Sequence, residues 1–156
     1  MIASRNDGKG GNLMKISTRG RYALRLMVEL ALNYHTNTNL SLKTISQKQD
    51  ISIKYLEQIV TPIARAGYVT SIRGAQGGYR LAGKPADYTV GMILRITEGS
   101  LCPVACVEED HESCDRLDCC ITYNVWAQIR DAVSNVVDHI TLEDLVQDYY
   151  LKNPKE

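Results

Sequence analysis

Residues 41–81 combine two short helical patterns with a glycine-rich hairpin, and this combination constrains the fold more than any other feature. Ser41 and Ser52 each precede an apolar pattern of helical spacing, where a serine can cap the first turn. Residues 68–72 and 79–81 are then predicted as strands around a tip of sequence Arg-Gly-Ala-Gln-Gly-Gly. Two short helices joined by a turn and followed by such a hairpin predict a winged helix-turn-helix, a fold that docks on double-stranded DNA.

Further helical patterns lie on both sides of this segment. Apolar residues recur every three or four positions in residues 19–34 and 123–140, a shorter helix is expected at residues 89–97, and Thr141 is expected to cap a final one. Pro62 lies late in the second short helix, whose last turn is therefore expected to bend or to end early. The expected fold class is mainly α with a small β-hairpin wing.

The predicted domain organisation has four parts. They are a disordered N-terminal extension (1–13), a winged helix-turn-helix DNA-binding domain (14–99), a cysteine-rich sensor loop (100–122), and a dimerisation helix with a C-terminal tail (123–156). A long helix after a small domain favours burial of its apolar stripe on a second copy of the chain; packing back on its own domain is the alternative.

The formal net charge of zero hides a division between the two halves of the chain. Residues 14–90 contain eleven Lys and Arg against four Asp and Glu, whereas residues 91–156 contain five against thirteen. A basic half indicates a polyanionic partner such as nucleic acid, and chance clustering of solvated charge is the alternative.

All five cysteines lie between Cys102 and Cys120. The sequence contains no apolar run of membrane-spanning length, and its first residues lack the apolar core of a signal peptide, so we expect a cytoplasmic protein. In that compartment clustered cysteines favour metal binding or redox sensing over structural disulfides. Neither a cofactor fingerprint nor a nucleophile–base pair is evident, and we expect no enzymatic activity.

Two stretches carry a resemblance to a known family. MKISTRGRYALRLMVELA (14–31) and YLEQIVTPIARAGYVTSIRGAQGGYRLA (55–82) resemble the Rrf2 family of winged-helix regulators, and the resemblance extends from residue 14 to about residue 149. It implies a homodimer in which a recognition helix and a wing bind a DNA operator, and in which the long helix crosses between subunits. The expected function is that of a transcriptional regulator, most simply a repressor, which senses iron–sulfur, redox or cysteine status.

The resemblance also assigns residues to DNA contacts. Gln58 matches a position that can read adenine, Glu57 can accept a hydrogen bond from cytosine N4, and Arg73 matches the wing arginine; a solvated helix residue is the alternative for Glu57. Ser17, Arg19 and Arg21 match phosphate contacts, with plain surface charge as the alternative for the arginines. Tyr55 is either a base contact or a packing residue. The complete predicted DNA-binding set is Ser17, Arg19, Arg21, Ser41, Ser52, Lys54, Tyr55, Glu57, Gln58, Arg73, Gly74, Gln76, Gly77 and Gly78.

Cluster-binding members of the family use three cysteines before the long helix, which here correspond to Cys106, Cys114 and Cys120. Tyr123 stands where a family ligand is histidine, and Arg21 where another is a carboxylate, so the fourth ligand is assigned to His111, Cys102 or Cys119. Thiolates suit a 2Fe–2S cluster, a zinc ion, or a thiol–disulfide switch without metal.

The stretches Cys102-Pro103-Val104, residues 126–133 and residues 141–145 are similar to one branch of the family. That branch represses cysteine metabolism and uses a cysteine synthase as its protein partner. This likeness gives the alternative function, a regulator controlled by a protein partner without a cluster. Typical members of the branch lack the loop cysteines that this chain carries.

Overall fold

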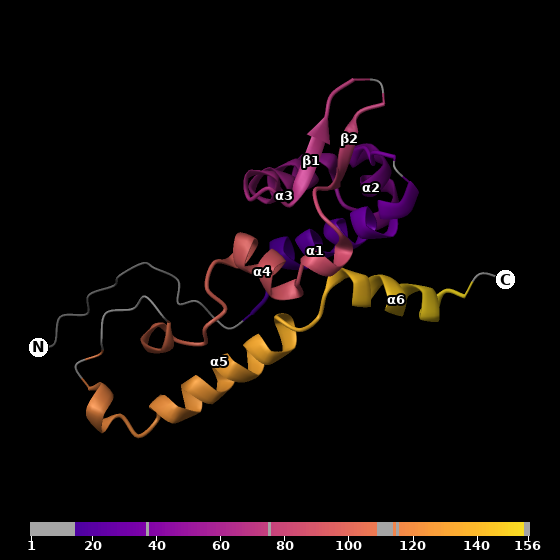
Figure 1. Ribbon diagram of the computed structural model, residues 1–156. Helices are drawn as coiled ribbons and strands as arrows, with labels where there is room; N and C mark the ends of the chain where they lie inside the picture. Colours follow the sequence, from indigo (N-terminus) through magenta and orange to yellow (C-terminus); the bar gives the residue numbers. More distant parts are fainter. Residues whose placement is uncertain (1–14, 37, 75, 109–113, 115, 155–156) are drawn as a thin grey trace, which may run out of the picture.

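A computed structural model of the chain describes residues 15–36, 38–74, 76–108, 114 and 116–154. The predicted extension at residues 1–13 and the predicted ligand His111 lie outside these residues. In chain order the elements are α1 (Thr18–Leu32), η1 (Tyr34–Thr36), α2 (Leu42–Gln49), α3 (Ile53–Arg65), β1 (Val69–Ile72), β2 (Gly78–Leu81), η2 (Pro85–Asp87), α4 (Val90–Glu98), η3 (Ala105–Val107), η4 (Leu117–Cys119), α5 (Tyr123–Val137) and α6 (Leu142–Lys152). Figure 1 shows α1 at the centre, the hairpin projecting from one end, and α5 extending away from the other.

Serine caps define the helix-turn-helix, as the sequence predicts. The Ser41 hydroxyl accepts a hydrogen bond from the Thr44 amide at 3.1 Å, and the Ser52 hydroxyl accepts one from the Tyr55 amide at 3.3 Å. Between the two helices Asp50 adopts a left-handed conformation with φ of 52°, which turns the chain sharply. Each cap satisfies an amide that the helix leaves unpaired, a contribution of about 1 kcal/mol.

One apolar core joins the helices to the base of the wing. α1 contacts α2, α3, α4 and α6, so it is the central element of the domain. The core side chains come from the predicted apolar stripes and are almost completely buried: Leu26, Met27, Leu30, Ile45, Leu56, Ile59, Ile63, Ile93 and Leu142.

A buried carboxylate fixes α2 against α1. Glu29 of α1 is only 7% exposed and accepts hydrogen bonds from Lys48 at 3.1 Å and from Gln49 at 2.7 Å. A buried charge is tolerated only when it is paired in this way. Because both donors lie in the last turn of α2, Glu29 also fixes the turn from which α3 departs.

The wing is a two-stranded antiparallel hairpin in which Val69 pairs with Leu81 and Ile72 with Gly78. Leu40, which precedes α2, forms a bridge to Tyr79 through two backbone hydrogen bonds of 2.9 and 2.8 Å. The returning strand is therefore attached to the segment before α2 close to its tip-side end, and the tip itself extends beyond the helices (Figure 1).

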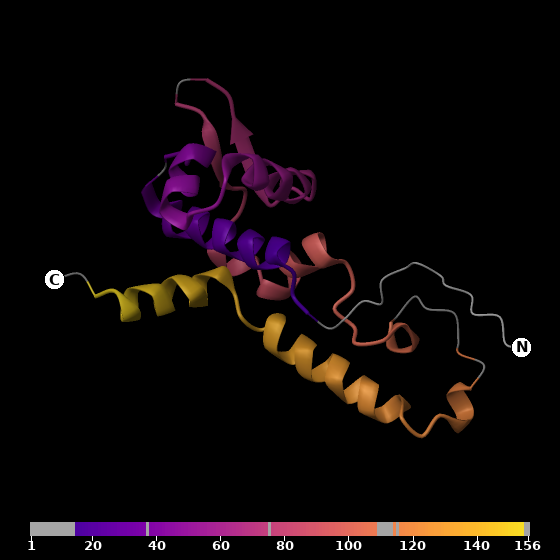
Figure 2. The same ribbon diagram turned by 180° about the vertical axis from the view of Figure 1, so that it is seen from behind.

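α5 leaves the domain with its apolar stripe uncovered. No residue of α5 is buried, and the exposed fraction is 50% for Val125 and 57% for Val136. Among the described elements α5 packs mainly against α4 and η3, and Figure 2 shows it diverging from α6. Arg95 of α4 holds the carboxyl-terminal end of α5, the end next to the domain, by two hydrogen bonds to Asp138, and these bonds lower the pKa of that carboxyl group.

The structure corrects one expectation and adds one detail. α3 does not end at Pro62 but continues to Arg65: only the hydrogen bond that an amide at position 62 would donate is lost, and the Pro62 carbonyl still accepts from the Ala66 amide at 3.0 Å. The cysteine-rich segment, expected to be a plain loop, contains the short helices η3 and η4. No helix among the described residues is long and apolar enough to cross a membrane.

Candidate nucleic-acid interface

The outer face of α3 is polar and accessible. Lys54, Glu57 and Gln58 are exposed on the side opposite Leu56 and Ile59, as expected for a helix that enters a major groove. Tyr55 differs, because its ring is half-buried and makes an edge-to-face contact with Tyr22 at 5.8 Å between ring centroids. The side chain of Tyr55 therefore packs α3 against α1.

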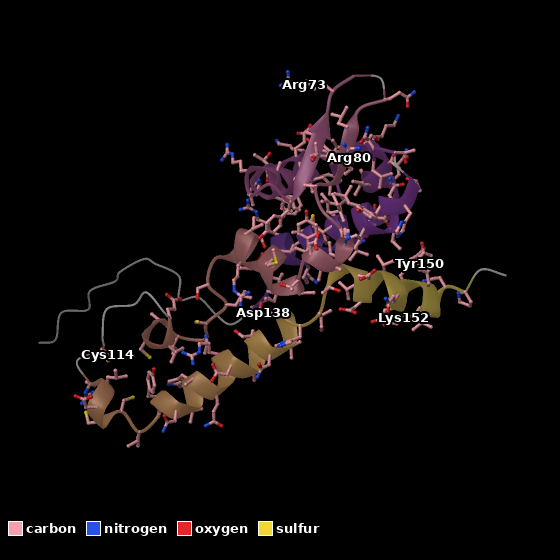
Figure 3. The ribbon with its side chains drawn as sticks, viewed as in Figure 1. Arg73, Arg80, Cys114, Asp138, Tyr150 and Lys152 are labelled. Carbon is pink, nitrogen blue, oxygen red and sulfur yellow. The ribbon has the colours of Figure 1, made fainter. Side chains whose placement is uncertain are left out.

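The wing presents its predicted residues at and near its tip. Arg73 is exposed and projects beyond the end of β1, as Figure 3 shows. The Asn39 side chain donates a hydrogen bond to the carbonyl of Gln76 at 3.1 Å, which connects the returning side of the tip to the segment before α2. An exposed arginine on an anchored hairpin can enter a minor groove, whose negative potential attracts guanidinium.

The amino-terminal turn of α1 is fixed by a residue from far along the chain. Ser17 caps α1 by accepting from the Gly20 amide at 3.2 Å, and its hydroxyl donates to Glu98 of α4 at 2.6 Å. The Ser17 amide donates to the other Glu98 oxygen at 3.4 Å. A Cβ atom at position 20 would collide with this carboxylate, so glycine there gives it room.

Removing the Glu98 carboxylate tests this arrangement. We expect Glu98→Ala to lower the free energy of unfolding by about 1–2 kcal/mol, because the Ser17 hydroxyl and amide lose a charged acceptor. Glu98→Gln keeps an acceptor oxygen, and its loss should be less than half as large. Urea denaturation followed by circular dichroism measures both. Equal stability of the alanine variant and the unsubstituted protein would show that the contact is unimportant.

The two predicted phosphate contacts in this turn point to different sides of α1. Arg19 faces α3, where its guanidinium donates to the backbone carbonyl of Gln58 at 3.5 Å. Arg21 donates to Thr18 at 3.2 Å and lines a cavity between α1 and α6. The structure thus brings Arg19, but not Arg21, to the exposed face of the recognition helix.

The predicted ligand cysteines do not converge in the part of the chain that the structure describes. Among those residues, no three His, Cys, Asp or Glu side chains lie close enough to hold a metal ion. Cys102 contacts the carbonyl of Val107 at 3.7 Å, and Cys114 and Cys119 are exposed. Figure 3 places Cys114 at the end of the molecule opposite Arg73. The described residues therefore do not show a fit to a cluster or to zinc.

The Cys120 thiol has a lowered pKa. Its sulfur lies 3.4 Å from the Thr122 hydroxyl, and hydrogen bonding to Thr122 lowers the pKa of the thiol from its usual value. The side-chain contact with Thr122 is the main cause of the lowering. A larger thiolate fraction makes a cysteine more reactive towards oxidants.

A model of the Rrf2 family, described as an iron-dependent transcriptional regulator, matches residues 16–148. The chain belongs to the Rrf2 family. Its sequence is 49% identical over 132 residues to the transcriptional regulator CymR of Bacillus subtilis, covering 85% of this chain and 89% of that protein. The chain is therefore a transcriptional regulator of this family, in agreement with the resemblance noted from its sequence.

Solved structures of Rrf2 regulators have the same fold. The structure of CymR, the global cysteine regulator of B. subtilis, superposes with a TM-score of 0.70 at 47% identity and covers 85% of this chain and 96% of its own. T. potens IscR superposes with a TM-score of 0.73 at 36% identity and covers 91% and 93%. These matches confirm the mainly helical winged helix-turn-helix architecture.

Sequence reasoning missed two polar residues at this interface. Arg65 is exposed at the end of α3 and lies on the same face as Gln58, seven residues earlier, so helical spacing alone could have identified it. Glu98 carried no such signal, because its contact with Ser17 spans 81 residues.

Proposed function

We propose that this Rrf2-family chain is a cytoplasmic, homodimeric, sequence-specific repressor without enzymatic activity. α3 enters the major groove and the hairpin lies on an adjacent minor groove. The observation that carries the proposal is the accessible polar face of α3 beside an anchored wing with Arg73 near its tip. The predicted contacts Ser17, Ser41 and Ser52 have capping hydroxyls, and within the proposal they fix the helices that meet DNA.

Operator selection from random duplexes tests the DNA-binding part. We expect the protein to enrich a sequence with two-fold symmetry. Gln58→Ala should bind that duplex about 10-fold more weakly and lose discrimination at one base pair of each half-site, because a good bidentate base contact contributes about 1–3 kcal/mol. Gln128→Ala on α5 is the matched control. No enriched sequence, or equal effects of the two variants, would contradict sequence-specific reading by α3.

The signal that controls the repressor is proposed to act through the cysteines between α4 and α5. The contact with Thr122 lowers the pKa of the Cys120 thiol in this segment, and Glu98 at the end of α4 contacts Ser17 before α1. The metal content of protein purified without oxygen distinguishes three mechanisms. A 2Fe–2S cluster on Cys106, Cys114 and Cys120 gives equimolar iron and sulfide, and a zinc site gives zinc alone. A thiol–disulfide switch gives neither metal, and its free thiols are lost on oxidation. DNA affinity measured before and after oxidation reveals whether any of them regulates.

The likeness to CymR favours a second source of control. Since that relative is the global cysteine regulator of B. subtilis, we propose sulfur-containing amino-acid metabolism as the regulated process here. A cysteine synthase is the partner expected in this case. Purified cysteine synthase should then change the operator affinity of the unsubstituted protein. It should change by the same amount the affinity of a variant in which all five cysteines are replaced by serine.

A further inference from the structure

Pro62 leaves one carbonyl of α3 without its helical donor. In an α-helix the amide of residue 62 would donate to the carbonyl of residue 58, but proline has no amide hydrogen. The Gln58 carbonyl instead accepts from the guanidinium of Arg19, which reaches it from the first turn of α1 at 3.5 Å. The proline thus creates an acceptor on the exposed side of the helix, and this acceptor holds an arginine against the recognition helix.

Arg19 and Arg65 border one groove beside the predicted base contact. The groove has a volume of about 420 Å³, and its lining consists of Arg19, Tyr55, Gln58, Ile59, Thr61, Pro62 and Arg65. Its lining includes two guanidinium groups and no carboxylate. Among the described residues Arg65 makes no hydrogen bond or ion pair, so its guanidinium is available to a ligand.

The groove also lies where a DNA strand would pass beside α3. Arg65 lies seven residues after Gln58, about 10 Å along the helix axis, on the same face. A sugar–phosphate strand borders the major groove that Gln58 would enter, and it must pass beside α3 there. Since Ser17 and Glu98 fix the turn that carries Arg19, little conformational freedom remains to be lost when an anion binds.

We propose that Arg19 and Arg65 form a phosphodiester-binding subsite, and that Pro62 is the positioning residue that orients Arg19 within it. The inference rests on the proposed DNA-binding function and adds to it a contact that fixes α3 in register on the duplex. Phosphate contacts position a protein without specifying bases. Arg65 thereby acquires a role as a contact to the DNA backbone, and Pro62 a role in positioning Arg19.

The test measures binding to a mixed-sequence 30-base-pair duplex from 50 to 300 mM salt, in addition to the selected operator. Each lost phosphate contact reduces the slope of log affinity against log salt by about 0.9, or about 1.8 for a dimer that contacts two equivalent phosphates. We expect Arg65→Ala to reduce the slope by this amount and to weaken both duplexes about 5- to 20-fold. Lys152→Ala removes the same charge from α6, away from the groove and the wing (Figure 3), and should leave the slope nearly unchanged.

Pro62→Ala separates positioning from helix stability. The alanine amide can donate to the Gln58 carbonyl and release Arg19, so the urea midpoint should rise while DNA affinity falls about 3-fold or more and the salt slope decreases. A variant that is more stable but weaker on DNA cannot owe its weaker binding to a structural defect. Unchanged affinity and slope in Pro62→Ala would overturn the positioning role, and the same result in Arg65→Ala would overturn the subsite.

Two controls separate the phosphate subsite from base-specific binding and from binding of an acidic protein. In one outcome the unsubstituted protein enriches no operator while the salt slopes on the mixed duplex still decrease in Arg65→Ala and Pro62→Ala. That result would support the phosphate subsite and contradict sequence-specific repression. A fluorescent poly-glutamate peptide is measured in parallel. If this peptide, rather than the duplex, loses affinity in Arg65→Ala, the groove binds an acidic protein segment and the proposal is wrong.

Discussion

Replacing Gly78 with alanine is expected to lower the free energy of unfolding by about 2–5 kcal/mol, because the new side chain both strains the backbone and collides with it. Gly78 has φ of +151°, and a Cβ atom there would lie 2.5 Å from the Leu40 carbonyl oxygen and 2.9 Å from the Ser41 nitrogen. Both contacts are with backbone, which cannot move aside as a flexible side chain can. The bridge between Leu40 and Tyr79 must open to relieve them.

The same substitution should weaken operator binding about 10-fold or more, because the wing loses its attachment to the helix-turn-helix. Arg73 is then no longer held at the DNA, and its contribution to binding is of the order of 1–3 kcal/mol. Gly67→Ala provides the control: Gly67 also has a positive φ, of 78°, but nothing lies within 4 Å of an added Cβ. We expect it to lose about 1 kcal/mol of stability through strain alone and to retain DNA binding. Urea denaturation and fluorescence anisotropy measure both variants, and equal destabilisation would argue against the clash.

The helix starts were predictable because their signals are local. Ser41, Ser52 and Thr141 each lie directly before an apolar pattern, and each caps a helix in the structure. Helix ends were less accurate: the helix expected to reach residue 34 ends at Leu32, and the one expected to reach residue 140 ends at Val137. Neither end is followed by a glycine that would mark it.

The candidate interface was predictable only where one element determines it. Helical spacing places Gln58 and Glu57 on the exposed face of α3 without knowledge of any other segment. The contacts of Arg19 with Gln58 and of Ser17 with Glu98 join residues 39 and 81 positions apart, and they depend on how α1 packs against α3 and α4. Composition and spacing carry no information about such contacts. For the same reason the spacing of the cysteines could not establish which of them converge.

The exposed apolar stripe of α5 is the place where a substitution should have a second large effect, on dimerisation. Val125 and Val136 lie on one face with Ile129, at intervals of four and seven residues, and the two valines are at least half exposed in the single chain. Exposed apolar surface of this extent indicates a protein partner. We infer that a second copy of the chain covers the stripe, as the proposed homodimer requires, so that two recognition helices reach two half-sites together.

Val136→Asp should therefore dissociate the dimer. Each interface would bury two unpaired carboxylates, one from each copy, and a penalty of several kcal/mol corresponds to a dimer about 100-fold or more weaker. Multi-angle light scattering at micromolar concentration should give the 17.4 kDa monomer in place of twice that mass. Binding to a two-fold operator should decrease at least as strongly, because a monomer engages only one half-site.

Asn135→Asp is the matched control, since it adds the same charge at the adjacent position, about 100° around the helix and on the polar face that also carries Gln128 and Asp131. It should remain dimeric and bind the operator normally. Circular dichroism of Val136→Asp should show full helix content, because Val136 contributes nothing to the buried core of the single chain. A Val136→Asp protein that is folded, dimeric and active would show that another surface joins the two copies. In that case the apolar stripe of α5 would have to be covered by a different protein.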